Sequence, residues 1–222
     1  MTTGETIFKL LRRRLEESSD STDTNANWSA DEKTDAIAVA IRYLMSNLAK
    51  PYLAPLLKNQ SLGASNDTIE FGTSEIANTD DIISVLVKRT SSNYPDKYAE
   101  IITIQERAEI SDNEYFSATL NSPICYIVEP TTAGDVKLKI EPTNQEQAIY
   151  DIIVTYYAPP TTITDSAVVN LLLPDETLNA LLYLAEAECW RIDNNPNRAG
   201  LAMQLGLGEI EKLNGRYNPD IQ

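Results

Sequence analysis

The chain has 222 residues, with 33 acidic side chains against 18 basic ones and no histidine. This length suits one domain, or one domain that carries a large insertion. The absence of histidine excludes Ser-His-Asp and Cys-His nucleophile systems, histidine-ligated zinc sites and imidazole pH switches. The net charge of −15 argues against a surface that wraps duplex DNA, which needs basic side chains to neutralise phosphates. Composition therefore favours a binding or structural protein over an enzyme.

The N-terminal segment predicts a first helix over residues 4–17. Three arginines, Arg12, Arg13 and Arg14, follow around this helix. A polar stretch at 18–27 then predicts a loop. The apolar side chains of the helix fall on one stripe at helical spacing: Ile7, Phe8, Leu11 and Leu15.

A second helix is predicted to begin after Ser29, because Ser29 and Glu32 have the spacing of a capping box. Apolar residues at steps of three and four continue the helix to about residue 49, and Pro51 then ends the pattern. A further short turn is expected at 52–58. The apolar stripe of the second helix consists of Ala36, Ile37, Ala40, Ile41, Leu44 and Leu48.

The middle of the chain changes to short segments rich in β-branched and aromatic residues, which predict strands. A hairpin turn is expected at 131–135, and the spacing of Thr103 and Glu106 predicts a small helix at 104–110. The predicted strands are 82–90, 98–103, 124–129, 136–141 and 149–157.

Helical spacing returns near the C-terminus. One helix is predicted from Pro174 to about residue 193, and a last helix over 199–213, where the glycines of 200–208 permit close packing. Asn214 and Gly215 then predict the helix end.

The order of helices, then strands, then helices predicts an α+β fold, in which a helical bundle carries an antiparallel β-rich insertion. We expect residues 1–60 and 166–222 to form the helical body and residues 61–165 to form the insertion. The insertion holds six basic and seventeen acidic residues, a net charge of −11, whereas the N-terminal part is neutral. The acidity therefore belongs mainly to one module.

No catalytic, cofactor-binding or metal-binding constellation stands out in the sequence. Cys125 and Cys189 form no CxxC pair, so the simplest interpretation is two reduced, buried thiols. The pair Asp80-Asp81 has no further acidic residues at ligand spacing and is interpreted as a solvated turn. We expect no secretory signal and no membrane span, and therefore synthesis in a cytosol.

Two polar segments are candidate contact sites. The run Arg12–Arg14 either contacts nucleic acid or an acidic partner, or forms a solvated helix face paired with Glu16 and Glu17. The C-terminal segment 214–222, with Arg216, Tyr217 and Ile221, is either a frayed end or an arm that orders on a partner.

The succession of these elements resembles the head–tail adaptor (connector, or neck-ring) proteins of tailed bacteriophages, short-tailed and crAss-like phages included. Trp28 precedes an acid-capped helix, and an acidic helix start leads to a Trp-Arg pair at 190–191. The resemblance covers about residues 5–215. Its strand motifs are Pro123-Ile-Cys-Tyr-Ile-Val, Leu138-Lys-Ile-Glu-Pro142 and Ile153-Val-Thr-Tyr-Tyr-Ala-Pro159.

This resemblance implies a structural virion protein without cofactor. It implies a ring of copies, commonly twelve, that binds the portal protein, extends the DNA channel and meets the next tail or nozzle protein below. DNA would pass through without specific binding. Three alternatives stay open: another neck or tail ring protein such as a terminator or nozzle subunit, a small carboxylate-based enzyme, and a nucleic-acid regulator acting through Arg12–Arg14.

Overall fold

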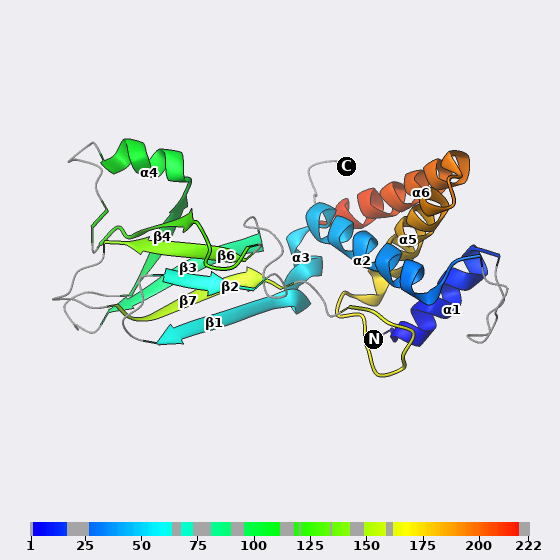
Figure 1. Cartoon of the computed structure of the whole chain (residues 1–222), viewed down its shortest axis with the longest axis horizontal. Coiled ribbons are helices and arrows are strands. Elements are labelled where there is room, and N and C mark those ends of the chain that lie inside the picture. The colour runs from blue at the N-terminus through cyan, green and yellow to red at the C-terminus, as the bar shows by residue number, and fades with distance from the viewer. Residues whose placement is uncertain are drawn as a thin grey trace. The chain divides into compact units, whose positions relative to one another are not determined.

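The computed structural model describes residues 2–16, 27–63, 68–72, 81–89, 96–111, 118–119, 121–133, 135–142, 149–158 and 162–217 (Figure 1). The chain divides into two compact units, one of Met1–Leu56 with Pro160–Gln222 and one of Leu57–Pro159. The first unit contains N- and C-terminal helices that pack together, and the second contains a seven-stranded sheet. The predicted α+β class is confirmed.

The helical unit is built around one central helix. This helix packs against the first, second and last long helices of the unit (Figure 1). The central helix is α5 (Leu178–Ile192). The other elements of the unit are α1 (Gly4–Arg14), α2 (Ala30–Asn47), α3 (Lys50–Leu53) and α6 (Pro196–Asn214), with 3-10 turns at Ala54–Leu56 and Asp175–Thr177.

Capping side chains set where the long helices begin. Ser29 accepts a hydrogen bond from the backbone N–H of Glu32 at 3.1 Å, and the Glu32 carboxylate accepts one from the N–H of Ser29 at 2.7 Å. The predicted capping box of α2 is therefore confirmed. The last helix begins earlier than predicted, at Pro196 instead of 199, because proline suits the first helical turn and the Asn195 side chain caps it.

Two tryptophans anchor the core of the helical unit. The rings of Trp28 and Trp190 meet edge to face with their centroids 4.8 Å apart. The indole N–H of Trp28 donates to the carbonyl oxygen of Cys189 at 2.9 Å, so this buried polar atom is satisfied. The predicted stripe of α1 is buried against this core, and Ile7, Phe8 and Leu11 are fully covered.

The second unit is a seven-stranded sheet with the strand order β1-β7-β3-β4-β5-β6-β2. All neighbouring strands run antiparallel except β4 and β5, which are parallel and are connected through α4 (Ile104–Ser111). The prediction of an antiparallel insertion is therefore correct for all pairs but this one. The strands are β1 (Leu57–Gly63), β2 (Thr68–Phe71), β3 (Ile82–Arg89), β4 (Lys97–Ile102), β5 (Ile124–Val128), β6 (Val136–Glu141) and β7 (Ile149–Tyr157).

Two strands were absent from the sequence prediction. The turn expected at 52–58 ends at Leu56, and Lys58 already lies in β1, where it pairs with Tyr156 of β7. The strand β2 pairs with β6. Both are edge strands, and β1 is mostly polar, so neither carries a strong hydrophobic pattern.

One face of the sheet holds the core of the second unit. Alternating residues of β2, β3, β6 and β7 point into it, and Tyr156 is buried there while the neighbouring Tyr157 is half-buried. The predicted hairpin between β5 and β6 is present, as is the capping box of α4, in which Thr103 and Glu106 exchange hydrogen bonds of 2.7 and 3.2 Å.

Candidate interaction surfaces

The arginine run of α1 does not form one free basic surface. The Arg12 side chain is buried, its guanidinium forms an ion pair with Asp165, and the cation lies over the ring of Phe8. Asp165 belongs to the segment that returns from the sheet unit to α5. Arg12 therefore fixes this return segment to α1, and its exposure is too small for a broad contact with nucleic acid.

The other two arginines differ from Arg12 and from each other. Arg14 lies over the ring of Tyr183 with its guanidinium carbon 3.8 Å from the centroid, and 3.6 Å separates its nitrogen from the Glu186 carboxylate. Arg13 is exposed. One of the two alternatives for this run paired it with Glu16 and Glu17. Glu16 instead lies 3.6 Å from Arg198 of α6, and Glu17 lies outside the described residues.

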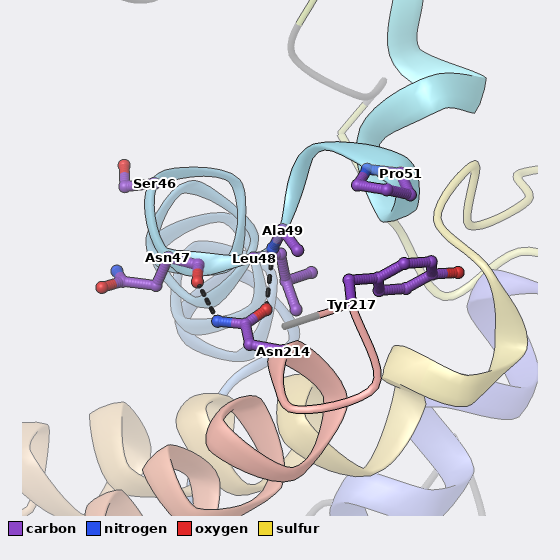
Figure 2. Close-up of a pocket in the computed structure, with 7 residues that line it drawn as sticks. All are labelled: Ser46, Asn47, Leu48, Ala49, Pro51, Asn214 and Tyr217. Carbon is purple, nitrogen blue, oxygen red and sulfur yellow. Dashed lines mark hydrogen bonds between the residues drawn. The ribbon is translucent and has the colours of Figure 1, made fainter. Parts of the chain in front are cut away.

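A pocket of about 470 Å³ lies where α2 and α6 both end (Figure 2). The side chain of Asn214 closes one wall, since it accepts a hydrogen bond from the Ala49 N–H and donates one to the Asn47 carbonyl, both at 2.7 Å. The remaining lining comes from Ser46, Leu48, Pro51 and Tyr217. The pocket thus combines apolar walls with the carboxyl ends of two helices, where the helix dipoles place partial negative charge.

The described part of the C-terminal segment is ordered against the helical unit. Tyr217 is half exposed and packs edge to face on Tyr52, with ring centroids 5.0 Å apart. Arg216 forms an ion pair with Glu176, although both side chains stay more than half exposed. Ile221 lies outside the described residues. The helix ends at Gly215 as predicted, but its φ of −59° is right-handed, so no left-handed conformation requires the glycine there.

The sheet unit carries a compact ionic cluster beneath α4. Glu141 accepts hydrogen bonds from the Tyr126 hydroxyl at 2.7 Å and from Arg107 at 3.0 Å. Burial acts to raise the pKa of Glu141, but these two hydrogen bonds and the positive charges of Arg107 and Lys139 together outweigh it, and the pKa is lowered. The pKa of Tyr126 is raised, first by burial and then by its bond to Glu141. The cluster ties α4 to β5 and β6, although the buried Nε of Arg107 has no hydrogen-bond partner in it.

The described residues offer no metal centre and no membrane span. No group of three or more histidine, cysteine, aspartate or glutamate side chains is gathered there to hold an ion, and no helix among them is long and apolar enough to cross a bilayer. Cys125 and Cys189, both among the described residues, form no disulfide and are buried, as predicted, and burial raises the pKa of the Cys125 thiol to about 12. Asp80 lies outside the described residues.

Sequence reasoning missed the pocket and the roles of its asparagines. The hydrogen bonds of Asn214 join it to residues that precede it in the chain by 165 and 167 positions, and no local motif predicts such a pairing. The one available signal was the position of Asn214 at a predicted helix end, where asparagine frequently serves as a cap.

The comparison with protein families supplies the identity of the chain. Residues 1–221 match the family model described as SU10 adaptor protein. A search of curated proteins found no match. The matched region spans both the helical unit and the sheet unit. The chain therefore belongs to the SU10 adaptor protein family, and it is a structural head–tail adaptor protein of the phage particle, not an enzyme.

Proposed function

We propose that copies of this chain form a ring, commonly of twelve, that binds the portal protein of the phage head and extends the DNA channel toward the tail. The observation that carries the proposal is the family match over residues 1–221. The next tail or nozzle protein would bind on the far side of the ring.

The charge of the chain supports a channel through which DNA passes without being held. The chain carries a net charge of −15, and acidic walls repel phosphates. Of the three arginines in the basic run, Arg12 and Arg14 already pair with Asp165 and Glu186. Strong, sequence-independent binding of duplex DNA needs several free basic side chains on one surface, so we expect none at physiological salt.

We further propose that Arg13 and the C-terminal segment contact partners in the virion. Arg13 is exposed on α1, and Tyr217 offers a half-exposed ring at the rim of the pocket. Arg216 can leave its exposed ion pair with Glu176 and bind a carboxylate of another virion protein at little cost, because exposed ion pairs contribute about 0–1 kcal/mol. Ile221 remains part of this proposed arm.

The proposal is tested by mixing the purified chain with purified portal rings and imaging by electron microscopy. We expect rings of density attached to one end of the portal. The variant Arg13→Glu should reduce the decorated fraction with little change in the melting temperature. Tyr217→Ala should reduce the decorated fraction too, with a small fall in melting temperature because the ring contact with Tyr52 is lost. Arg191→Glu is the matched control, because the Arg191 side chain is 73% exposed and its ion pair with Glu188 spans one turn of its own helix. Portals that stay bare at every salt concentration would refute portal binding, and density at the tail end of purified particles would favour a terminator or nozzle subunit.

A further inference from the structure

The last helix exposes apolar side chains on the face opposite its buried one. Leu201 is 61% exposed and Leu205 is 45% exposed, and the same line continues through Gly208 to Lys212. We call these four residues the α6 outer stripe. The inner face of α6 is already used, since Ala202, Gly206, Ile210 and Leu213 are buried within the helical unit. Leu201 and Leu205 lie one turn apart, so they form a short apolar strip that another surface can cover.

One glycine of α6, Gly208, lies on the same outer face. A Cβ at Gly206 would lie 3.0 Å from the Leu184 side chain, so close packing against α5 explains that glycine. A Cβ at Gly208 would meet nothing within 4 Å. Glycine is a poor helix former, and packing within this chain gives no reason for it at position 208. The open space beside Gly208 can take a side chain of another molecule.

A second exposed line lies on α2. It consists of Asp31, Asp35, Val39 and Arg42, which we call the α2 outer stripe. Within this stripe, the Val39 side chain is 40% exposed, while the opposite face of α2 holds the buried Ile37, Ala40 and Ile41. The α2 outer stripe therefore has an acidic N-terminal half and one apolar contact point.

The two stripes are complementary when the helices run antiparallel. With Leu205 of one copy set against Val39 of another, Lys212 lies two helical turns away on the first helix, and Asp31 lies about two turns away on the second. The lysine amine then meets the aspartate carboxylate. Lys212 is free to do so, because its partner within the chain is Glu209, at 3.7 Å, and the Lys212 side chain is 67% exposed. The C-terminal end of α6 also meets the N-terminal end of α2, which is the favourable alignment of helix dipoles.

We propose that the α6 outer stripe of one copy binds the α2 outer stripe of the next copy. This inference rests on the proposed ring. The two stripes lie on different helices, each of which packs against α5 (Figure 1). In the proposed contact, a copy uses its α6 outer stripe for one neighbour and its α2 outer stripe for another. Such a head-to-tail contact closes into a ring or continues as a filament, whereas a contact between two identical stripes would stop at a dimer.

Cross-linking between two single variants tests the pairing directly. Full-length Leu205→Cys chain is mixed with full-length Val39→Cys chain and oxidised mildly, once alone at high concentration and once on portal rings. Both native thiols are buried and stay out of the reaction. We expect the mixed product at least tenfold above the product formed when Lys9→Cys, an exposed position on α1, replaces Val39→Cys. Preferential linking of Leu205→Cys chains to each other would overturn the head-to-tail contact.

A matched pair of leucine variants tests the energetic role of the stripe. Leu205→Asp should weaken self-association at least tenfold in sedimentation experiments, whereas Leu207→Asp should not, because Leu207 is similarly exposed at 41% but lies off the stripe. Lys212→Glu should also weaken association, and mixing with Asp31→Lys chain should restore it. Equal effects of Leu205→Asp and Leu207→Asp, or no rescue, would contradict the proposal.

The outcomes separate this interface from portal binding. If the 205–39 cross-link forms in the free chain while portal rings stay undecorated, the interface is supported and portal binding, the proposed function, is refuted. Decorated portals without the 205–39 cross-link would refute the interface and leave portal binding intact. Absence of both would refute both.

Discussion

The side chain of Asn214, at the end of α6, hydrogen-bonds to both sides of the α2 terminus. Its oxygen accepts from the Ala49 N–H and its nitrogen donates to the Asn47 carbonyl, each at 2.7 Å (Figure 2). A helix of this kind leaves its last four carbonyls without partners inside the helix. Of the four in α2, Leu44 accepts from the Leu48 N–H and Asn47 accepts from Asn214. One side chain thus caps α2 and fastens it to α6.

Replacing Asn214 should therefore destabilise the helical unit. Asn214→Ala removes two hydrogen bonds, each of which contributes about 1 kcal/mol, so we expect a loss of roughly 1–2 kcal/mol. Asn214→Asp should cost more, because it loses the donor and places a negative charge beside two helix C-termini. Urea denaturation followed by circular dichroism measures both. Asn197→Ala, at an exposed position of the same helix, is the control, and an equal loss in that variant would mean that the cap contributes nothing.

The buried face of α2 should not tolerate a charge. Ile41 is 4% exposed, and Ile41→Asp would place an unpaired carboxylate in the core, at a cost of about 4 kcal/mol or more. We expect the variant to lose its cooperative thermal transition. Val39→Asp, two residues away on the exposed face, should keep the transition. If Ile41→Asp chain stays folded and fails only in assembly, this face is an interface instead of core.

The sequence predicted well what short-range patterns determine. The capping box of Ser29 and Glu32 and the apolar stripe of α1 appear as expected, because both depend on residues within one or two helical turns. The hairpin between β5 and β6 was predictable for the same reason. The family resemblance rested on the order of such elements along the chain.

The features that the sequence did not predict depend on distant partners. The strand β1 exists because its backbone pairs with β7, about 90 residues later, and its polar side chains give no alternating pattern. The role of Arg12 depends on Asp165, 153 residues away. Charge runs are usually assigned to solvent, and only the fold reveals that this arginine is buried against an acid. The pocket beside Asn214 was hidden for the same physical reason.

The stability of the helical unit should fall in acid through its capping box. Hydrogen bonds from the backbone and side chain of Ser29 lower the pKa of Glu32 from its ordinary value of 4.5. A carboxylate with a lowered pKa in the folded state stabilises the fold above about pH 4.5, and this contribution is lost as pH falls through the lowered value. Glu32→Gln chain should therefore be less stable than the native chain at pH 7, and the gap should narrow toward pH 3. Urea denaturation midpoints of the two chains at pH 7 and pH 3 measure this difference in stability. A difference that does not change with pH would contradict a stabilising role for the ionised Glu32 carboxylate.

The thiols should be inert in the folded chain. Cys125 and Cys189 are fully buried, and burial raises the pKa of the Cys125 thiol to about 12, so the reactive thiolate is scarce at neutral pH. We expect a colourimetric disulfide reagent at pH 8 to modify neither thiol in the native chain and both in urea. Cys125→Ser should not change labelling of the native chain, although it should lower stability, since a hydroxyl in this apolar core lacks a partner. Rapid labelling of Cys125 without denaturant would show that the sheet core opens readily, because the reagent must reach a side chain that Ile152 and Val154 otherwise help to enclose.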